Sequence, residues 1–129
     1  MPIFSQLSKK RLATCHPDLQ VVCNELIKQY DFSVLEGRRG EYAQNAAYEK
    51  GTSNVRYPHS AHNKTPSLAV DIAPYPIDWD NISRFHEMMI RFDTIANILR
   101  REGIIDSEFV YGGQWAGLKD WPHVEIKEK

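Results

Sequence analysis

Three side chains of this sequence are of the types that hold a catalytic metal ion. His62 and Asp71 lie in the middle of the chain, and His123 lies near its end. Two imidazoles and one carboxylate leave one coordination position of Zn²⁺ open for water, whereas closed structural sites use four protein ligands. These residue types therefore indicate a hydrolytic zinc site with one ion per chain.

A second carboxylate lies close to the third of these ligands. Asp120 precedes His123 by three residues, which places it beside the metal without making it a ligand. This is the position of a general base that takes a proton from water. Glu125 follows His123 by two residues, so on a strand it shares a face with the imidazole and orients it. The alternative for Glu125 is a solvated carboxylate near the chain end.

An arginine completes the set of candidate catalytic residues. Arg39 lies in a Gly-flanked turn, Glu36-Gly37-Arg38-Arg39-Gly40, after a short apolar run. We expect its guanidinium to face a developing oxyanion or a substrate carboxylate. Arg38 and Arg56 are weaker candidates for this role, and we expect them to be solvated.

The hydrophobic pattern predicts the elements that position these residues. Apolar residues with helical spacing predict helices over 17–30 and 41–50 and a long one that begins after Asp78 or Asp80 and ends before Gly103. Shorter apolar runs predict strands at 32–35, 68–73, 108–111 and 123–126, and residues 52–67 read as a loop. The elements do not alternate regularly, which favours an α+β fold with a small, mostly antiparallel sheet packed with helices.

Bulk properties limit the class of protein. The chain has 129 residues, of which 42% are apolar and 26% charged, so we expect one soluble catalytic domain over residues 1–129. A net charge of −1 gives no basic surface for nucleic acid or for a membrane. The first residues have no signal-peptide pattern, and we expect synthesis in a cytoplasm. Cys15 and Cys23 are expected to be reduced, partly buried thiols, and Trp79 is expected in the core.

The local motifs resemble a known enzyme family. Ser60-x-His62, Ala69-x-Asp71 and Asp120-x-Pro122-His123 resemble motifs of the zinc peptidases that cleave peptidoglycan stem peptides. That group contains D-alanyl-D-alanine carboxypeptidases and L-alanyl-D-glutamate endopeptidases with the Hedgehog-type fold, and the likeness is greatest to its phage endolysins. The likeness also includes residues 35–40, 44–45 and 67–79, so it extends over most of the chain from about residue 32.

The resemblance implies a role for each candidate residue. It makes His62, Asp71 and His123 the zinc ligands, Asp120 the catalytic base, Arg39 the family's Gly-x-Arg arginine and Ser60 a substrate contact. The interval from His62 to Asp71 is longer than the family's common spacing, which affects the shape of the substrate pocket more than metal binding.

The likeness to compact endolysins favours hydrolysis of the L-alanyl-D-glutamate bond. A D-alanyl-D-alanine carboxypeptidase and a non-catalytic, zinc-stabilised wall-binding module are the alternatives. Asp120 favours an enzyme, because a binding module needs no carboxylate at that spacing. The resemblance further implies a protein made in the host bacterial cytoplasm, which acts on peptidoglycan after holin-assisted release. We also expect a monomer.

Overall fold

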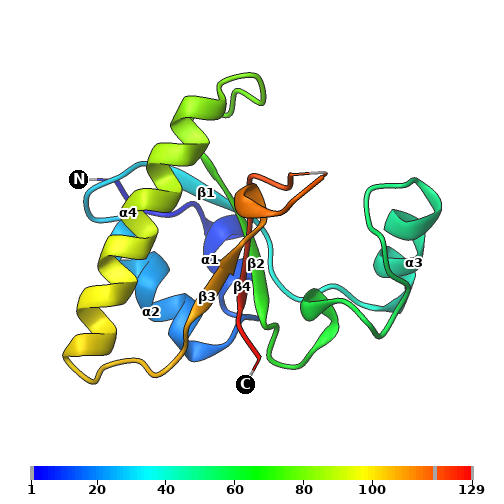
Figure 1. Ribbon diagram of the computed structural model, residues 1–129, viewed down its shortest axis with the longest axis horizontal. Helices are drawn as coiled ribbons and strands as arrows, with labels where there is room; N and C mark the ends of the chain where they lie inside the picture. The colour runs from blue at the N-terminus through cyan, green and yellow to red at the C-terminus, as the bar shows by residue number, and fades with distance from the viewer. Residues whose placement is uncertain (1, 118, 129) are drawn as a thin grey trace.

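The computed structural model describes residues 2–117 and 119–128 and has an α+β architecture (Figure 1). The helices are α1 (Gln6–Leu12), α2 (Pro17–Leu26), α3 (Glu41–Glu49) and α4 (Ile82–Arg101), with short 3₁₀ turns η1 (Ala61–Asn63) and η2 (Gly112–Gln114). The strands are β1 (Phe32–Glu36), β2 (Ala69–Pro74), β3 (Phe109–Tyr111) and β4 (His123–Ile126). The predicted fold class and the four predicted strands are confirmed.

The four strands form one antiparallel sheet in the order β1-β2-β4-β3. The two central strands, β2 and β4, are distant in sequence, and their register pairs Asp71 with His123 and Val70 with Val124. Side chains alternate between the faces of a strand, so one face carries the valines and the other carries the candidate metal ligands. The sheet therefore separates the core from the site.

Helices α1, α2 and α4 cover the core face of the sheet (Figure 1). The helix α4 packs on both α2 and β2, and α1 packs on β1. The core is apolar, and its largest fully buried side chains include Phe85, Phe92, Leu19, Leu26 and Ile72. Cys15 and Cys23 are free thiols buried in this core, as the sequence predicted.

The remaining helix, α3, stands away from this body at the opposite side of the molecule (Figure 1). It belongs to a segment, residues 40–61, that we call the α3 arm. The only buried side chain of α3 is that of Gln44, a polar residue, and α3 ends before Gly51, whose φ is 80°. The arm therefore attaches to the body without an apolar core of its own.

Three details differ from the sequence-based expectations. The helix α1 was not predicted, and its N-cap is Ser5. The predicted caps Asp78 and Asp80 are wrong: Asn81 caps α4, because the Asp78 side chain instead accepts a hydrogen bond from the Asp80 amide. Trp79, expected in the core, stacks on Phe85 but remains 55% exposed.

Among the helices of the described residues, none combines the length and the hydrophobicity that a membrane-spanning segment needs.

Candidate metal centre and catalytic groove

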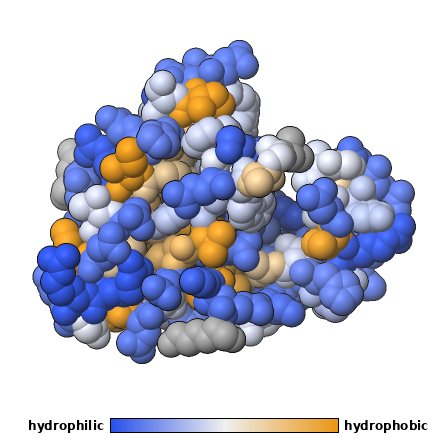
Figure 2. Space-filling model, in the orientation of Figure 1, coloured by the Kyte–Doolittle hydropathy of each residue, from blue (hydrophilic) through white to orange (hydrophobic). Residues whose placement is uncertain are grey.

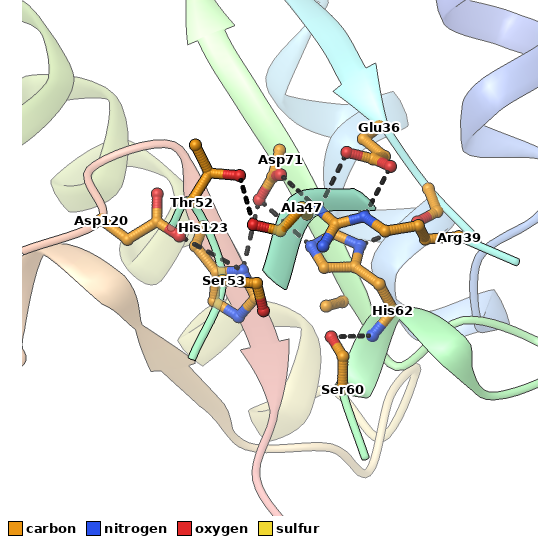
Figure 3. Close-up of polar contacts among 12 residues, drawn as sticks. Glu36, Arg39, Ala47, Thr52, Ser53, Ser60, His62, Asp71, Asp120 and His123 are labelled. Carbon is orange, nitrogen blue, oxygen red and sulfur yellow. Dashed lines mark hydrogen bonds and ion pairs between the residues drawn. The ribbon is translucent and has the colours of Figure 1, made fainter. Parts of the chain in front are cut away.

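The three residues expected to bind zinc converge on the outer face of the sheet (Figure 3). One oxygen of Asp71, Oδ1, lies 3.2 Å from His123 Nδ1 and 3.4 Å from His62 Nε2. One donor atom from each of the three residues lies within 4.8 Å of the others. Asp71 and His123 come from paired strands, and His62 from the turn η1, so the group is held by backbone structure.

The side chain of His62 is oriented for metal binding. Its Nδ1 lies 2.8 Å from the carbonyl oxygen of Gly37, and since a carbonyl only accepts, Nδ1 carries the proton. The other nitrogen, Nε2, therefore presents a lone pair toward Asp71. It is the one buried side-chain nitrogen or oxygen that lacks a hydrogen-bond partner within the described residues. A metal ion would satisfy this atom, so the donor set fits zinc.

Glycine is required at position 37 by close packing. A Cβ there would lie 2.3 Å from the Arg11 carbonyl oxygen and 2.2 Å from Thr14 Oγ1, at the end of α1. The absence of a side chain lets the strand end approach α1 and brings the Gly37 carbonyl to His62. The packing of Gly37 against the end of α1 thus sets the orientation of the His62 imidazole.

His123 is held between two carboxylates. Its Nδ1 faces Asp71, and its Nε2 lies 2.7 Å from Glu125 Oε1. Glu125 therefore orients the imidazole, as expected, and remains outside the ligand set. Burial would lower the pKa of His123, but the hydrogen bonds with Asp71 and Glu125 outweigh burial and raise its pKa to about 9. Burial likewise opposes ionisation of Asp71, but the hydrogen bond with His123 holds its pKa well below the usual range.

Zinc binding is therefore expected to release at least about one proton per ion at pH 7, because His123 must lose the proton on Nδ1 to become a ligand. Below pH 9 this proton is bound in the metal-free protein, so the apparent affinity should fall as the pH falls. Calorimetric titration with zinc in buffers of different ionisation enthalpy measures the number of protons. Binding without proton release would contradict this assignment of His123.

Arg39 lies beside Asp71, held by a two-point ion pair (Figure 3). Its Nε and Nη2 donate to the two carboxylate oxygens of Glu36 at 2.7 and 2.9 Å. The Nη2 atom is also 3.9 Å from Asp71 Oδ2, so the guanidinium charge acts on the metal centre. A bulge in β1 between Val34 and Glu36 brings Glu36 opposite Asp71 in the sheet register.

Gln44 connects this arginine to the α3 arm. Its side chain is fully buried, and its Oε1 accepts from Arg39 Nη1 at 3.0 Å and from Asn63 Nδ2 at 3.2 Å. Its Nε2 donates to Ser53 Oγ at 2.9 Å and to the Val55 carbonyl oxygen at 2.7 Å. One amide group thus uses its full hydrogen-bonding capacity to hold together the arm, η1 and Arg39.

Asp120 lies on the side of His123 away from Arg39 (Figure 3), at the end of the loop that follows η2. Its Oδ2 is 3.9 Å from His123 Nδ1, too far for a hydrogen bond, and its side chain is 44% exposed. Burial raises the pKa of Asp120, and repulsion from Asp71 adds to this rise. A carboxylate with a raised pKa beside the metal position suits a general base.

A groove leads from solvent to these residues; we call it the catalytic groove. Its cavity volume is about 600 Å³, within the usual range for ligand sites. One wall comes from residues 51–55 and 59–61 of the α3 arm, and the other from Trp115, Lys119 and Asp120. His123 and Glu125 also line it. Figure 2 shows the hollow between the lobe that carries α3 and the rest of the molecule.

The remaining sequence-predicted residues have separate surroundings. Ser60 lines the catalytic groove, but its Oγ also accepts from the His62 amide at 3.2 Å as the cap of η1, and its contact with substrate stays a prediction. Arg38 donates to Thr65 Oγ1, and Arg56 pairs with Glu49 at an exposed position. Sequence reasoning did not single out Glu36 or Gln44 as functional.

Known proteins with a similar sequence or structure indicate the family of this chain. Residues 2–128 match the family model described as phage L-alanyl-D-glutamate peptidase. The chain belongs to this family. An L-alanyl-D-glutamate peptidase of Escherichia phage T5 is 34% identical over 131 aligned positions, which cover 96% of this chain and 88% of that protein. The crystal structure of the Serratia marcescens L-Ala D-Glu endopeptidase ChiX superposes with a TM-score of 0.76 at 27% identity, covering 97% of this chain and 90% of that one. The family membership confirms the resemblance stated from the motifs.

Proposed function

We propose that this protein is a zinc-dependent endopeptidase that hydrolyses the L-alanyl-D-glutamate bond of bacterial peptidoglycan. The observation that carries the proposal is the convergence of His62, Asp71 and His123, with an unpaired buried nitrogen on His62 and a second carboxylate close by. Membership in the phage L-alanyl-D-glutamate peptidase family supports the choice of substrate bond.

Each residue has a distinct task in the proposed reaction. His62 Nε2, Asp71 and His123 Nδ1 would hold the zinc ion, which polarises a carbonyl group and acidifies water when it is bound. Asp120 takes the proton from the attacking water and later gives it to the departing amine. Glu125 and the Gly37 carbonyl fix the orientations of the two imidazoles.

Arg39 is proposed to place positive charge beside the reacting carbonyl and Asp71. Replacement by alanine is expected to lower turnover on the order of 10²-fold, as for loss of one donor to an oxyanion, with zinc content retained. The matched control is Arg38→Ala, since Arg38 bonds to Thr65 and makes no contact with the metal centre in the structure. For both variants, steady-state rates measure turnover and elemental analysis measures zinc content. A damaging Arg38→Ala beside a silent Arg39→Ala would contradict the assignment.

Mass spectrometry of fragments released from purified peptidoglycan tests the substrate bond. We expect new amino termini on D-glutamate, with L-alanine left on the glycan. Release of free D-alanine would instead identify a carboxypeptidase. No new termini from several wall types, with zinc bound, would identify a wall-binding module.

The proposal extends to the setting of the reaction. We propose that the protein acts as a monomer. In line with the endolysin resemblance, we also propose that it is made in the host bacterial cytoplasm and reaches the wall after a holin opens the membrane. Size-exclusion chromatography with light scattering tests the oligomeric state. Lysis of cells that express this chain with and without a holin tests the release step.

A further inference from the structure

A second groove opens on the other side of the loop that carries Asp120. It lies between α4 and β3, has a cavity volume of about 510 Å³, and we call it the α4–β3 groove. Hydrophobic surface is visible between these two elements in Figure 2, on the same face of the molecule as the catalytic groove. Its lining includes His86, Ile90, Asp93, Phe109, Lys119 and Trp121.

The two grooves are adjacent and share one lining residue. Lys119 lines both of them, and Trp121 in the α4–β3 groove directly follows Asp120 in the catalytic groove. A ligand that occupies the catalytic groove and extends past Lys119 therefore enters the α4–β3 groove. No part of the proposed mechanism uses this second groove.

The lining of the α4–β3 groove combines a flat apolar surface with a hydrogen-bond acceptor. The Trp121 indole lies against Gly113, where a Cβ would come within 2.5 Å of the ring, and against the edge of His86, with ring centroids 6.3 Å apart. Asp93 accepts from the Tyr111 hydroxyl at 2.9 Å and from Asn97 at 3.3 Å. A carboxylate has about four acceptor positions, so Asp93 retains capacity for a ligand hydroxyl or amide.

Such a lining suits a pyranose sugar. One face of the ring presents C–H groups that pack on an aromatic side chain, and the ring edge carries hydroxyl and acetamido groups that donate hydrogen bonds. The stem peptide of peptidoglycan begins with L-alanine, which is joined through a lactyl group to a sugar of the glycan strand. An amino-acid residue spans at most about 3.6 Å, so cleavage after this alanine brings the sugar next to the catalytic groove.

We propose that the α4–β3 groove binds an N-acetylated sugar of the glycan strand, as a subsite adjacent to the catalytic groove. This inference rests on the proposed endopeptidase function. The sugar occupies the α4–β3 groove and the D-glutamate side of the stem peptide occupies the catalytic groove. The protein thereby recognises the junction between glycan and peptide.

The test compares two substrates that share one stem peptide, with and without the N-acetylglucosaminyl-N-acetylmuramoyl disaccharide. We expect the wild-type kcat/KM to be higher for the disaccharide-bearing substrate, on the order of tenfold, which corresponds to about 1.4 kcal/mol. Ile90→Arg should reduce this ratio to about one, because Ile90 is 54% exposed in the lining and arginine fills the groove. The matched control Ile98→Arg changes another exposed isoleucine of α4, 46% exposed, that does not line the groove, and should leave the ratio at the wild-type value.

Equal kcat/KM values for the two substrates in the wild type would overturn the proposal. So would a preference that survives in Ile90→Arg, or an equal loss of activity on both substrates, which would indicate that the groove takes peptide.

An NMR titration with chitotriose tests the sugar subsite without catalysis. Amide shifts around the α4–β3 groove that Ile90→Arg abolishes support the sugar subsite even if the peptidase activity fails, and an absence of shifts rejects it.

Discussion

Replacement of Asp120 by asparagine is expected to slow hydrolysis by roughly 10²- to 10⁴-fold, with zinc content unchanged at about one ion per chain. Asparagine keeps the size and hydrogen-bonding capacity of the side chain but does not accept the proton of the attacking water. Asp120 lies 3.9 Å from the nearest nitrogen of His123 and is 44% exposed, so neither the core nor the ligand set depends on it. Turnover rates and elemental analysis on the same samples measure the effect.

The matched control for this variant is Asp106→Asn, which removes the same charge at an exposed position outside the lining of the catalytic groove. It should hydrolyse peptidoglycan at the wild-type rate. A wild-type rate in Asp120→Asn at equal zinc content would show that another group takes the proton.

Alanine at any one of His62, Asp71 or His123 is expected to abolish zinc retention and reduce hydrolysis to background. Two remaining donors do not hold a catalytic zinc ion, which ordinarily has three protein ligands. In addition, Asp71 lies between both imidazoles, so its loss removes the contact that aligns each of them. Elemental analysis after dialysis, together with the rate on peptidoglycan, measures both losses.

His59→Ala is the control for these ligand variants, because His59 lines the catalytic groove three residues before His62 and is exposed. It should keep about one zinc per chain. Near-ultraviolet circular dichroism separates loss of metal from loss of fold. Full zinc retention with full activity in one of the three alanine variants would exclude that residue from the metal site.

The central part of the site was predictable because its geometry is local. Apolar runs define β2 and β4, and strand alternation then places Asp71, His123 and Glu125 on the face opposite the buried valines. Pairing of Asp71 with His123 requires in addition that these two strands be neighbours in this register, which the structure shows. The same local reasoning identified Pro17 as the start of α2, and the structure shows His16 as its cap.

The support around the ligands could not be predicted, because it depends on contacts between distant segments. Glu36 lies opposite Asp71 and beside Arg39 because of the bulge in β1, and no periodicity indicates where a bulge falls. Gln44 looks like an ordinary polar residue of a helix. Its burial becomes evident only when η1 and residues 53–55 fold around it.

Two errors have similar causes. The helix α1 is short and strongly basic, and Leu12 and Ser8 are its only buried side chains, so its apolar pattern is weak. Trp79 is a large aromatic residue of a type that often lies in the core, but it is in the turn between β2 and α4. There one face of its ring stacks on Phe85 and the other side is left to solvent.

The polar attachment of the α3 arm has a consequence for the cooperativity of unfolding. Each hydrogen bond of Gln44 contributes a net of only about 1 kcal/mol, so residues 40–61 form a unit of lower local stability than the apolar body. Amide hydrogens of α3 should therefore exchange with solvent faster than those of Val70 and Val124 in the sheet. On heating, the arm opens first and releases Arg39 from Gln44 and one wall from the catalytic groove. Catalysis is then lost at a temperature at which the sheet is still folded.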